Sequence, residues 1–247
     1  EMDEAAGRGA SYLLWLGIRP GEVVSYQLPI WSEFAMLTIA CYKIGAVAHP
    51  IAMSYEEKEL ARSLNVTESR CYFGPTFFYK TDYEERILAV RDQVPLLKDV
   101  VLIDSVRERK SNVPLLREIL ASCEPLPKER CVHTKNGQDI AVILCTSGTT
   151  GGTKGVLLTH DNVRYSEDTF NRELGLTEED IMFMPAPLHH ATGFHHAIIA
   201  PMLHGAKVVL QQKYQCRSAI ELMNREKVTY SMGATPFIYD ILRELET

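Results

Sequence analysis

The sequence predicts an α/β protein. Short apolar runs of strand length alternate with helical patterns almost throughout its 247 residues, which is typical of strands that cross over to helices. Hydrophobic residues make up 46% of the chain, an ordinary share for a globular protein. A chain of this length can bury one large core or two smaller ones, so we expect one domain with subdivisions.

Each expected strand is a short apolar run, and each expected helix repeats apolar residues three to four positions apart. One such helix begins at Ser32, a suitable N-cap residue, and its apolar face consists of Phe34, Leu37, Cys41 and Ile44. Strands are expected at 22–27, 46–50, 70–73, 100–103, 140–145, 155–158, 181–184, 207–210 and 229–232. Helices are expected at 32–44, 55–65, 82–93, 115–122, 161–173, 193–204, 217–226 and 236–245.

Two segments bear on how the chain is divided. The first residues, EMDEAAGRGASYLLWLG, read as the middle of a helix, so we expect the protein to start upstream of Glu1. Residues 107–137 carry charged and proline-rich patches with little periodicity. This pattern predicts a surface connection, and we expect two subdomains joined near 105–137.

Composition excludes several classes of partner. The 32 acidic residues outnumber the 26 basic ones, and no run of Lys or Arg could follow a phosphate backbone, so nucleic acid is not expected as a partner. The most apolar stretches, 34–48 and 197–210, contain charged residues or proline and are too short to span a membrane. The six cysteines form no CxxC pair, which indicates free thiols in a reducing, cytoplasmic location.

The stretch LCTSGTTGGTKGVLLTH, residues 144–160, combines glycines, hydroxyl side chains and one lysine between two apolar runs. Glycine lets a backbone turn tightly and approach a ligand closely, and freed N–H groups with hydroxyls suit phosphate oxygens. A Walker loop would place a helix at the lysine. Here GVLLTH continues as an apolar strand after Lys154, so we expect a hairpin-like loop between two strands.

The sequence TSGTTGGTKG resembles the phosphate-loop signature [ST]SG[ST]TGxPKG of adenylate-forming enzymes, the superfamily of acyl-CoA synthetases, luciferases and adenylation domains. Thr153 replaces the proline of that signature, which should loosen the loop and leave the ligand contacts in place. Three further segments resemble the same family: GIRPGEVVSYQLPIWSEFAMLTIACYKIGAVAHPI, MPAPLHHATGFHH and YSMGATPFIYDIL. The last two are most similar to bacterial short- and medium-chain fatty acyl-CoA synthetases.

The resemblance implies a layered αβ fold with mixed, largely parallel sheets, as in the large N-terminal domain of these enzymes. It implies an AMP-forming acyl-CoA synthetase that uses ATP, Mg²⁺ and coenzyme A on a short- or medium-chain fatty acid. The family's adenine, ribose and hinge motifs and its C-terminal lysine do not occur in this sequence. We therefore expect residues 1–247 to be a partial N-terminal domain, without the C-terminal domain and inactive alone.

The resemblance also assigns site residues. His190 would lie beside the carboxylate of the acid, and Lys154 would neutralise the departing pyrophosphate, so both are the expected catalytic residues. The acyl pocket would be lined by Phe194, Gly233, Ala234 and Thr235. The β- and γ-phosphates of ATP would be held by Thr146, Ser147, Gly148, Thr149, Thr150, Gly151 and Lys154.

Some alternatives stay open. The pairs His189–His190 and His195–His196 raise the question of zinc, but no Cys, Asp or Glu lies within the segment, so no metal site is expected. His190 could instead cap a helix. The chain could also belong to an adenylation domain that loads another acid onto a carrier protein, although 230–238 offers no charged residue to receive an amino group. A non-catalytic nucleotide-binding fragment is the third alternative.

Overall fold

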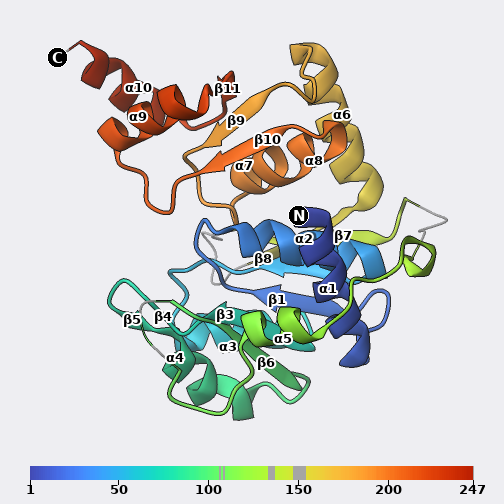
Figure 1. The fold of residues 1–247 in the computed structure, drawn as a ribbon. Coiled ribbons are helices and arrows are strands. Elements are labelled where there is room, and N and C mark those ends of the chain that lie inside the picture. The colour runs from blue at the N-terminus through green and yellow to red at the C-terminus, as the bar shows by residue number, and fades with distance from the viewer. Residues whose placement is uncertain (106, 108, 133–136, 147–153, 247) are drawn as a thin grey trace. The chain divides into compact units, whose positions relative to one another are not determined.

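The computed structural model describes residues 1–105, 107, 109–132, 137–146 and 154–246. They form two compact units, one of Glu1–Leu28 with Glu33–Thr159 and one of Pro29–Ser32 with His160–Thr247. Both units combine strands with helices (Figure 1), so the predicted α/β class is confirmed. The described part of 105–137 lies within the first unit, and the division between the units falls after Thr159.

The first unit is built on a sheet with the strand order β6-β3-β1-β2-β7-β8. Every neighbouring pair in it is parallel except β7 and β8, which are antiparallel. The central strand β1 is buried along its whole length, as a parallel strand covered on both faces should be. The strands are β1 (Val23–Tyr26), β2 (Val47–Pro50), β3 (Cys71–Pro75), β6 (Asp99–Ile103), β7 (Ile140–Thr146) and β8 (Lys154–Thr159).

The helices of this unit lie close to their expected positions. The predicted apolar face of α2 is confirmed, because its four members are all buried. The start of α4 is capped by Asp82, whose carboxylate accepts the N–H of Glu85 at 2.9 Å. The helices are α1 (Met2–Trp15), α2 (Ser32–Ile44), α3 (Glu57–Val66), α4 (Tyr83–Val90) and α5 (Leu116–Ser122), with 3-10 turns at Arg91–Gln93 and Lys128–Arg130.

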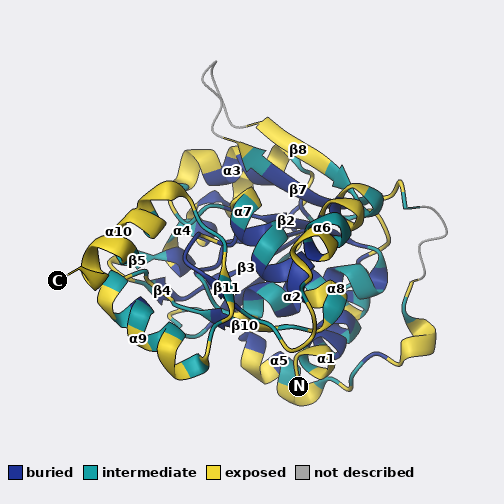
Figure 2. Cartoon of the chain, turned by 90° about the horizontal axis from the view of Figure 1, so that it is seen from above, coloured by how far each residue is buried: buried dark blue, intermediate teal, exposed yellow. Residues whose placement is uncertain are grey.

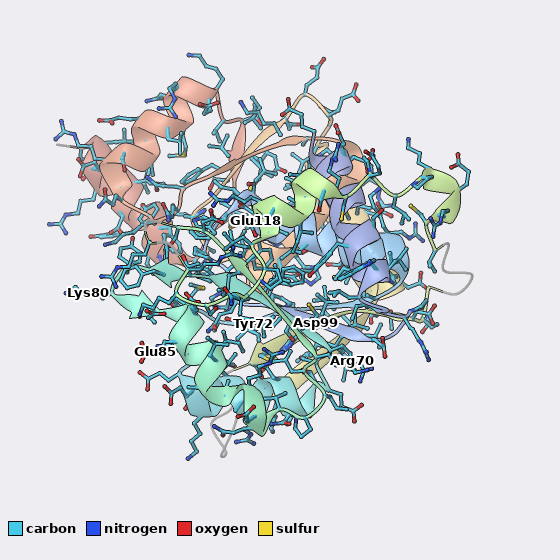
Figure 3. The ribbon with its side chains drawn as sticks, turned by 60° about the horizontal axis from the view of Figure 1, so that its bottom comes forward. Arg70, Tyr72, Lys80, Glu85, Asp99 and Glu118 are labelled. Atoms are coloured by element: carbon cyan, nitrogen blue, oxygen red, sulfur yellow. The ribbon has the colours of Figure 1, made fainter. Side chains whose placement is uncertain are left out.

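Parallel pairing of β3 with β6 aligns Cys71 with Asp99, which brings Arg70 and Asp99 close together at the start of the two strands (Figure 3). Further along β3, Tyr72 is fully buried and donates its hydroxyl to Gln27 Oε1 at 2.9 Å. The ring of Tyr72 packs in an apolar cluster that includes residues of α3, α4 and β6. This cluster is the core beneath the α3 and α4 face of the sheet.

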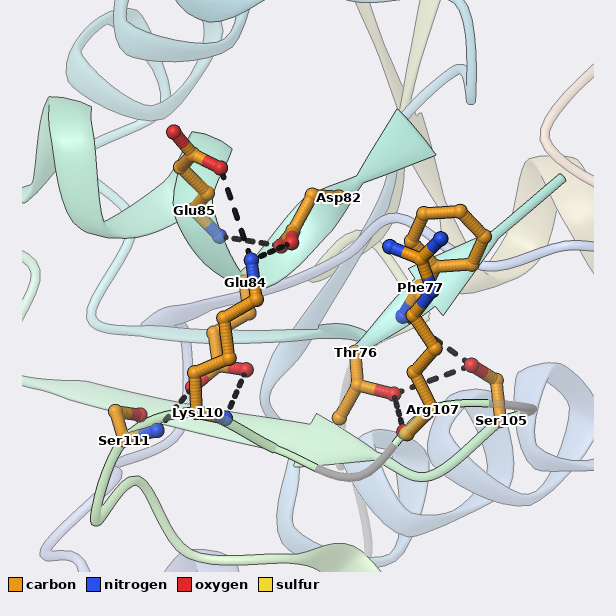
Figure 4. A network of polar contacts seen from close by, with 9 residues as sticks. All are labelled: Thr76, Phe77, Asp82, Glu84, Glu85, Ser105, Arg107, Lys110 and Ser111. Atoms are coloured by element: carbon orange, nitrogen blue, oxygen red, sulfur yellow. Dashed lines mark hydrogen bonds and ion pairs between the residues drawn. The ribbon is translucent and has the colours of Figure 1, made fainter. Parts of the chain in front are cut away.

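A buried glutamate holds part of the irregular segment after β6 in place (Figure 4). Glu84 is 2% exposed, and its carboxylate accepts the backbone N–H groups of Lys110 and Ser111, both at 2.7 Å. Nearby, the hydroxyl of Thr76 donates to the carbonyl oxygen of Arg107 at 2.9 Å. These bonds satisfy backbone groups that neither helix nor sheet satisfies. The short hairpin β4 (Phe77–Phe78) and β5 (Thr81–Asp82) was not expected, because two-residue strands show no periodicity.

The second unit contains a three-stranded parallel sheet in the order β10-β9-β11. Its strands are β9 (Ile181–Met184), β10 (Lys207–Leu210) and β11 (Tyr230–Ser231). The helix expected at 193–204 is interrupted: α7 (Ala191–Phe194) continues as a π-helix, η3 (His195–Ile199), before α8 (Ala200–His204). The other helices are α6 (His160–Leu174), α9 (Cys216–Glu226) and α10 (Thr235–Leu245).

Two sequence expectations concern the chain as a whole. All six cysteines are free, as expected from their spacing. Within the described ranges, no helix has both the length and the apolar character needed to cross a bilayer.

Candidate functional site

The glycine-rich segment lies between the two strands of an antiparallel pair. Thr146 at the end of β7 is aligned with Lys154 at the start of β8, and the Thr146 hydroxyl donates to the carbonyl oxygen of Lys154 at 3.4 Å. The hairpin expectation is therefore confirmed, and the Walker alternative is wrong because a strand, not a helix, begins at Lys154. Five predicted phosphate ligands fall outside the described residues: Ser147, Gly148, Thr149, Thr150 and Gly151.

The hairpin presents an available cation. Thr146 and Lys154 are both exposed, and β8 is exposed along its first four residues (yellow in Figure 2), whereas β7 beside it is mostly buried. Among the described residues, no carboxylate lies within ion-pair distance of Lys154. An ammonium group without a carboxylate partner among the described residues is suited to an anionic ligand such as a phosphate.

A buried polar network around His49, which the sequence pattern does not predict, lies at the base of this hairpin. His49 on β2 is fully buried. Its Nδ1 lies 2.7 Å from Ser25 Oγ, and its Nε2 lies 3.3 Å from Ser63 Oγ and 3.5 Å from Cys145 Sγ. Because Cys145 directly precedes Thr146, the network joins three strands and α3 to the start of the glycine-rich segment.

The Cys145–His49 contact resembles a nucleophile–base pair, but its electrostatics do not suit that role. Burial lowers the pKa of His49 to about 3, and burial also raises the pKa of the Cys145 thiol. Both groups are therefore neutral near pH 7, whereas a nucleophilic cysteine needs a lowered pKa. The network positions the end of β7 and supplies no reactive thiolate.

The neutral His49 makes stability depend on pH. An unfolded histidine titrates near pH 6.5. Below that value the unfolded state binds a proton, whereas His49 in the folded state stays neutral. Stability is therefore lost as the pH falls from 6.5 towards 3. We expect His49 to contribute a loss of about 2 kcal/mol between pH 7 and pH 5, since one pKa unit is worth roughly 1.4 kcal/mol.

Chemical denaturation at several pH values would measure this effect. The variant His49→Gln should be less stable than the wild type at pH 7 and should lose less stability on acidification. Gln93→Ala, a change at an exposed side chain that carries no titratable group, serves as the control and should keep the wild-type slope. An identical pH slope in wild type and His49→Gln would contradict the neutral, buried assignment.

The second group of predicted residues lies in the second unit, around α7. His190 is exposed and occupies the N-cap position of α7, but its side chain makes no capping hydrogen bond. Within the described residues the ring therefore does not cap the helix, and it is exposed to solvent. His189 beside it is more buried, and this burial, together with the neighbouring His190, lowers the pKa of His189 to about 4.

The turn that carries His190 requires glycine at position 193. The N–H of Phe194 donates to the carbonyl oxygen of His190 at 2.8 Å, which folds the chain tightly. A Cβ atom at Gly193 would lie 2.2 Å from the carbonyl oxygen of Pro187 and 2.8 Å from Cα of Leu188. Phe194, next in the chain, is fully buried. The structure thus places His190 and Phe194 at opposite ends of one helical turn.

The remaining predicted pocket residues follow β11. Ala234 and Thr235 are exposed, and Gly233 is partly buried. A Cβ atom at Gly233 would lie 3.0 Å from Cγ of Pro185 and 3.4 Å from the ring of Phe237. Gly233 therefore lies against the segment that leads from β9 to His190, and a side chain there would press on Pro185.

A carboxylate that the sequence did not point to lies beside the second histidine pair. Glu167 of α6 is 1% exposed, with its Oε1 3.1 Å from His195 Nδ1 and its Oε2 3.0 Å from His196 Nδ1. A separation of 28 residues between Glu167 and His195 hides this contact from sequence inspection. In the part of the chain that the structure describes, no group of three or more His, Cys, Asp or Glu side chains is arranged to hold a metal ion.

Comparisons with known proteins agree with this architecture. A family model described as "AMP-binding enzyme" matches residues 1–247. Among curated relatives, the medium-chain fatty-acid–CoA ligase of Escherichia coli strain K12 is 40% identical over 245 residues, which cover 99% of this chain and 43% of that protein. The chain thus spans less than half the length of that relative.

Two solved structures share the fold. ATP-bound MatB from Rhodopseudomonas palustris superposes with a TM-score of 0.83 at 24% identity, over 98% of this chain and 45% of that one. The inhibitor-bound N-terminal domain of FACL13 from Mycobacterium tuberculosis superposes with a TM-score of 0.82 at 24% identity, over 97% of this chain and 56% of that one. The expected fold, mixed α/β with a largely parallel sheet, is confirmed.

Proposed function

Because this chain belongs to the AMP-binding enzyme family, we propose that it is part of an AMP-forming acyl-CoA ligase. The longer protein would convert a short- or medium-chain fatty acid, ATP and coenzyme A into acyl-CoA, AMP and pyrophosphate. The observation that carries the proposal is the hairpin pair Thr146–Lys154, where an exposed lysine without a described carboxylate partner lies at the edge of a glycine- and threonine-rich loop.

The reaction has two steps. A carboxylate oxygen of the acid attacks the α-phosphorus of ATP, forming a P–O bond and releasing pyrophosphate. The thiol of coenzyme A, losing its proton, then attacks the acyl carbon, and the C–O bond to AMP breaks. Both steps move negative charge among phosphate and carboxylate oxygens, so positioning and fixed donors supply most of the catalysis.

The residues of the hairpin have separate tasks in this scheme. The ammonium group of Lys154 and the hydroxyl of Thr146 bind oxygens of the β- and γ-phosphates, with Ser147, Gly148, Thr149, Thr150 and Gly151 completing the loop. Lys154 stabilises pyrophosphate as it leaves. The buried His49 network keeps the end of β7 in one place, which limits the movement of Thr146.

Mg²⁺ fits this arrangement only as a partner of the nucleotide. Of the two described residues beside the loop, Thr146 offers one hydroxyl oxygen and Lys154 offers a cation, so they form no all-protein magnesium site. Mg²⁺ usually keeps several waters and binds through substrate phosphates. When bound there, the ion would neutralise phosphate charge.

The residues around α7 would receive the acid. The exposed ring of His190 is available to bind the carboxylate, and Phe194, Gly233, Ala234 and Thr235 would line the acyl pocket. A medium-chain acid is favoured by the 40% identity to a medium-chain fatty-acid–CoA ligase. The segment 230–238 offers no charged group for an amino acid, which argues against the adenylation-domain alternative.

Acid-dependent exchange of labelled pyrophosphate into ATP tests the proposal in the full-length protein that contains this chain. Exchange should appear with straight-chain acids and be greatest for those of medium length. Exchange that responds only to amino or aryl acids would favour the adenylation-domain alternative. Nucleotide binding without exchange for any acid would favour the non-catalytic alternative.

A further inference from the structure

The face of α6 that packs inside the second unit is unusually polar. Its buried residues are Val163, Glu167 and Asn171, which are four positions apart and so share one side of the helix. Burying a carboxylate is costly unless charged or hydrogen-bonded partners compensate it. The partners of Glu167 therefore show which segment of the second unit this face of α6 contacts.

Those partners are the two histidines that begin the π-helix. Glu167 Oε1 lies 3.1 Å from His195 Nδ1 and accepts a further hydrogen bond from the Ser166 hydroxyl at 2.9 Å. Glu167 Oε2 lies 3.0 Å from His196 Nδ1, close enough for an ion pair but without hydrogen-bond geometry, so the contact with His195 is the directed one. Although burial opposes ionisation, the contacts with His195 and His196 hold the pKa of Glu167 at about 2. An ionised carboxylate only accepts, so Nδ1 of His195 carries the proton.

The histidine rings extend this contact in two directions. The ring of His195 lies edge-on to the ring of Phe194, with centroids 6.0 Å apart. The ring of His196 packs on Phe170 of α6, with centroids 4.4 Å apart. The ring of His195 thus connects Glu167 to Phe194. The ring of His196 connects Glu167 to Phe170 on the same helix, α6. One turn further, Asn171 donates to the carbonyl oxygen of Ala200 at 3.0 Å and to His204 Nδ1 at 2.8 Å.

These contacts fall where the helix departs from regular geometry. Residues His195–Ile199 form a π-helix, and such turns are rare and occur frequently at functional sites. The turn directly follows Phe194 and the close approach at Gly193. A carboxylate that fixes the first two residues of this turn also fixes the direction in which Phe194 leaves α7.

We propose that Glu167 is a positioning residue for the acyl pocket: by holding His195 and His196 it sets the place of Phe194 and hence the fit of the fatty acyl chain. This role rests on the proposed function, because Phe194 is assigned to the acyl pocket there. Glu167 does not touch the acid. It acts through the ring of His195.

Kinetics of the full-length protein with straight-chain acids from four to twelve carbons test this role. In Glu167→Gln, the KM for the preferred acid should rise roughly tenfold, as expected for a small misplacement of a positioning group, while the KM for ATP stays unchanged. The preference between short and long acids should become flatter. Asp168→Asn, a neighbour on α6 with 45% of its side chain exposed, is the matched control and should behave as the wild type.

A second variant keeps the test decisive if Glu167→Gln folds poorly. His195→Asn keeps an N–H donor for Glu167 but removes the ring that packs on Phe194, so it should reproduce the change in acid KM and chain-length preference. Equal changes in the KM values for acid and ATP, or an unchanged chain-length profile in folded variants, would overturn the positioning role. A wild type that forms no AMP with any acid would instead overturn the proposed function, and this role with it.

Discussion

Replacing Lys154 with alanine is expected to lower the rate of acid-dependent AMP formation by about 100-fold to 1,000-fold, the usual loss when one preorganised donor to developing charge is removed. The lysine is exposed at the start of β8, so its removal disturbs little packing. The melting temperature should therefore stay within about 2 °C of the wild type, because exposed substitutions rarely change stability by more than roughly 0.5 kcal/mol.

Two further variants test whether the loss of rate is due to the charge and the position of Lys154. Lys154→Arg keeps the positive charge and should recover part of the lost rate, although its planar head cannot reproduce the point charge of an ammonium group. Lys58→Ala removes an exposed lysine from α3 in the same unit and should have no effect on rate. Wild-type kinetics in a folded Lys154→Ala variant would remove this residue from the site.

Replacing Gly193 with alanine is expected to destabilise the protein by about 3 kcal/mol, the upper end of the usual range for overpacking. The new Cβ would lie 2.2 Å from the carbonyl oxygen of Pro187. Because the contact is with backbone, no side-chain rotation relieves it, and the turn between His190 and Phe194 must open. Thermal unfolding should show a decrease of roughly 6–12 °C in Tm for a chain of this size.

Gly9→Ala in α1 is the matched control. A Cβ at Gly9 would meet the flexible Met36 Sδ at 3.0 Å and Ala40 Cβ at 3.3 Å. Alanine also has the better helix propensity, so the stability should change by no more than about 1 kcal/mol in either direction. Equal effects of the two substitutions would show that the close approach at Gly193 does not constrain the turn.

The hairpin could be predicted from the sequence because its signals are local. The apolar run before Thr146 and the apolar run after Lys154 are each strand-like, and the glycines between them indicate a turn. The short β4–β5 hairpin offers no such pattern. The interruption of the helix at His195 also escapes prediction, because the π-helical turn is only five residues long, too short for its wider i→i+5 spacing to show in the apolar pattern.

The two buried polar clusters, around His49 and around Glu167, are formed by residues that lie far apart in the sequence. His49 meets Ser25 because β1 and β2 pair in parallel register, which aligns these two residues directly. The segment that contains His195 and His196 has no carboxylate, and their carboxylate neighbour, Glu167, comes from another helix. Periodicity could have hinted at it, since Glu167 and Asn171 follow Val163 on one face of α6.

The fate of the oxygen atoms of the acid tests the central claim most directly. The full-length protein would be incubated with ATP, coenzyme A and octanoate carrying ¹⁸O in both carboxylate positions, and the nucleotide products analysed by mass spectrometry. Attack of the carboxylate on the α-phosphorus leaves one labelled oxygen on phosphorus when the thiol displaces AMP. We predict AMP that contains one ¹⁸O atom, together with unlabelled pyrophosphate. Formation of ADP with labelled inorganic phosphate would show attack at the γ-phosphorus and would contradict an AMP-forming ligase.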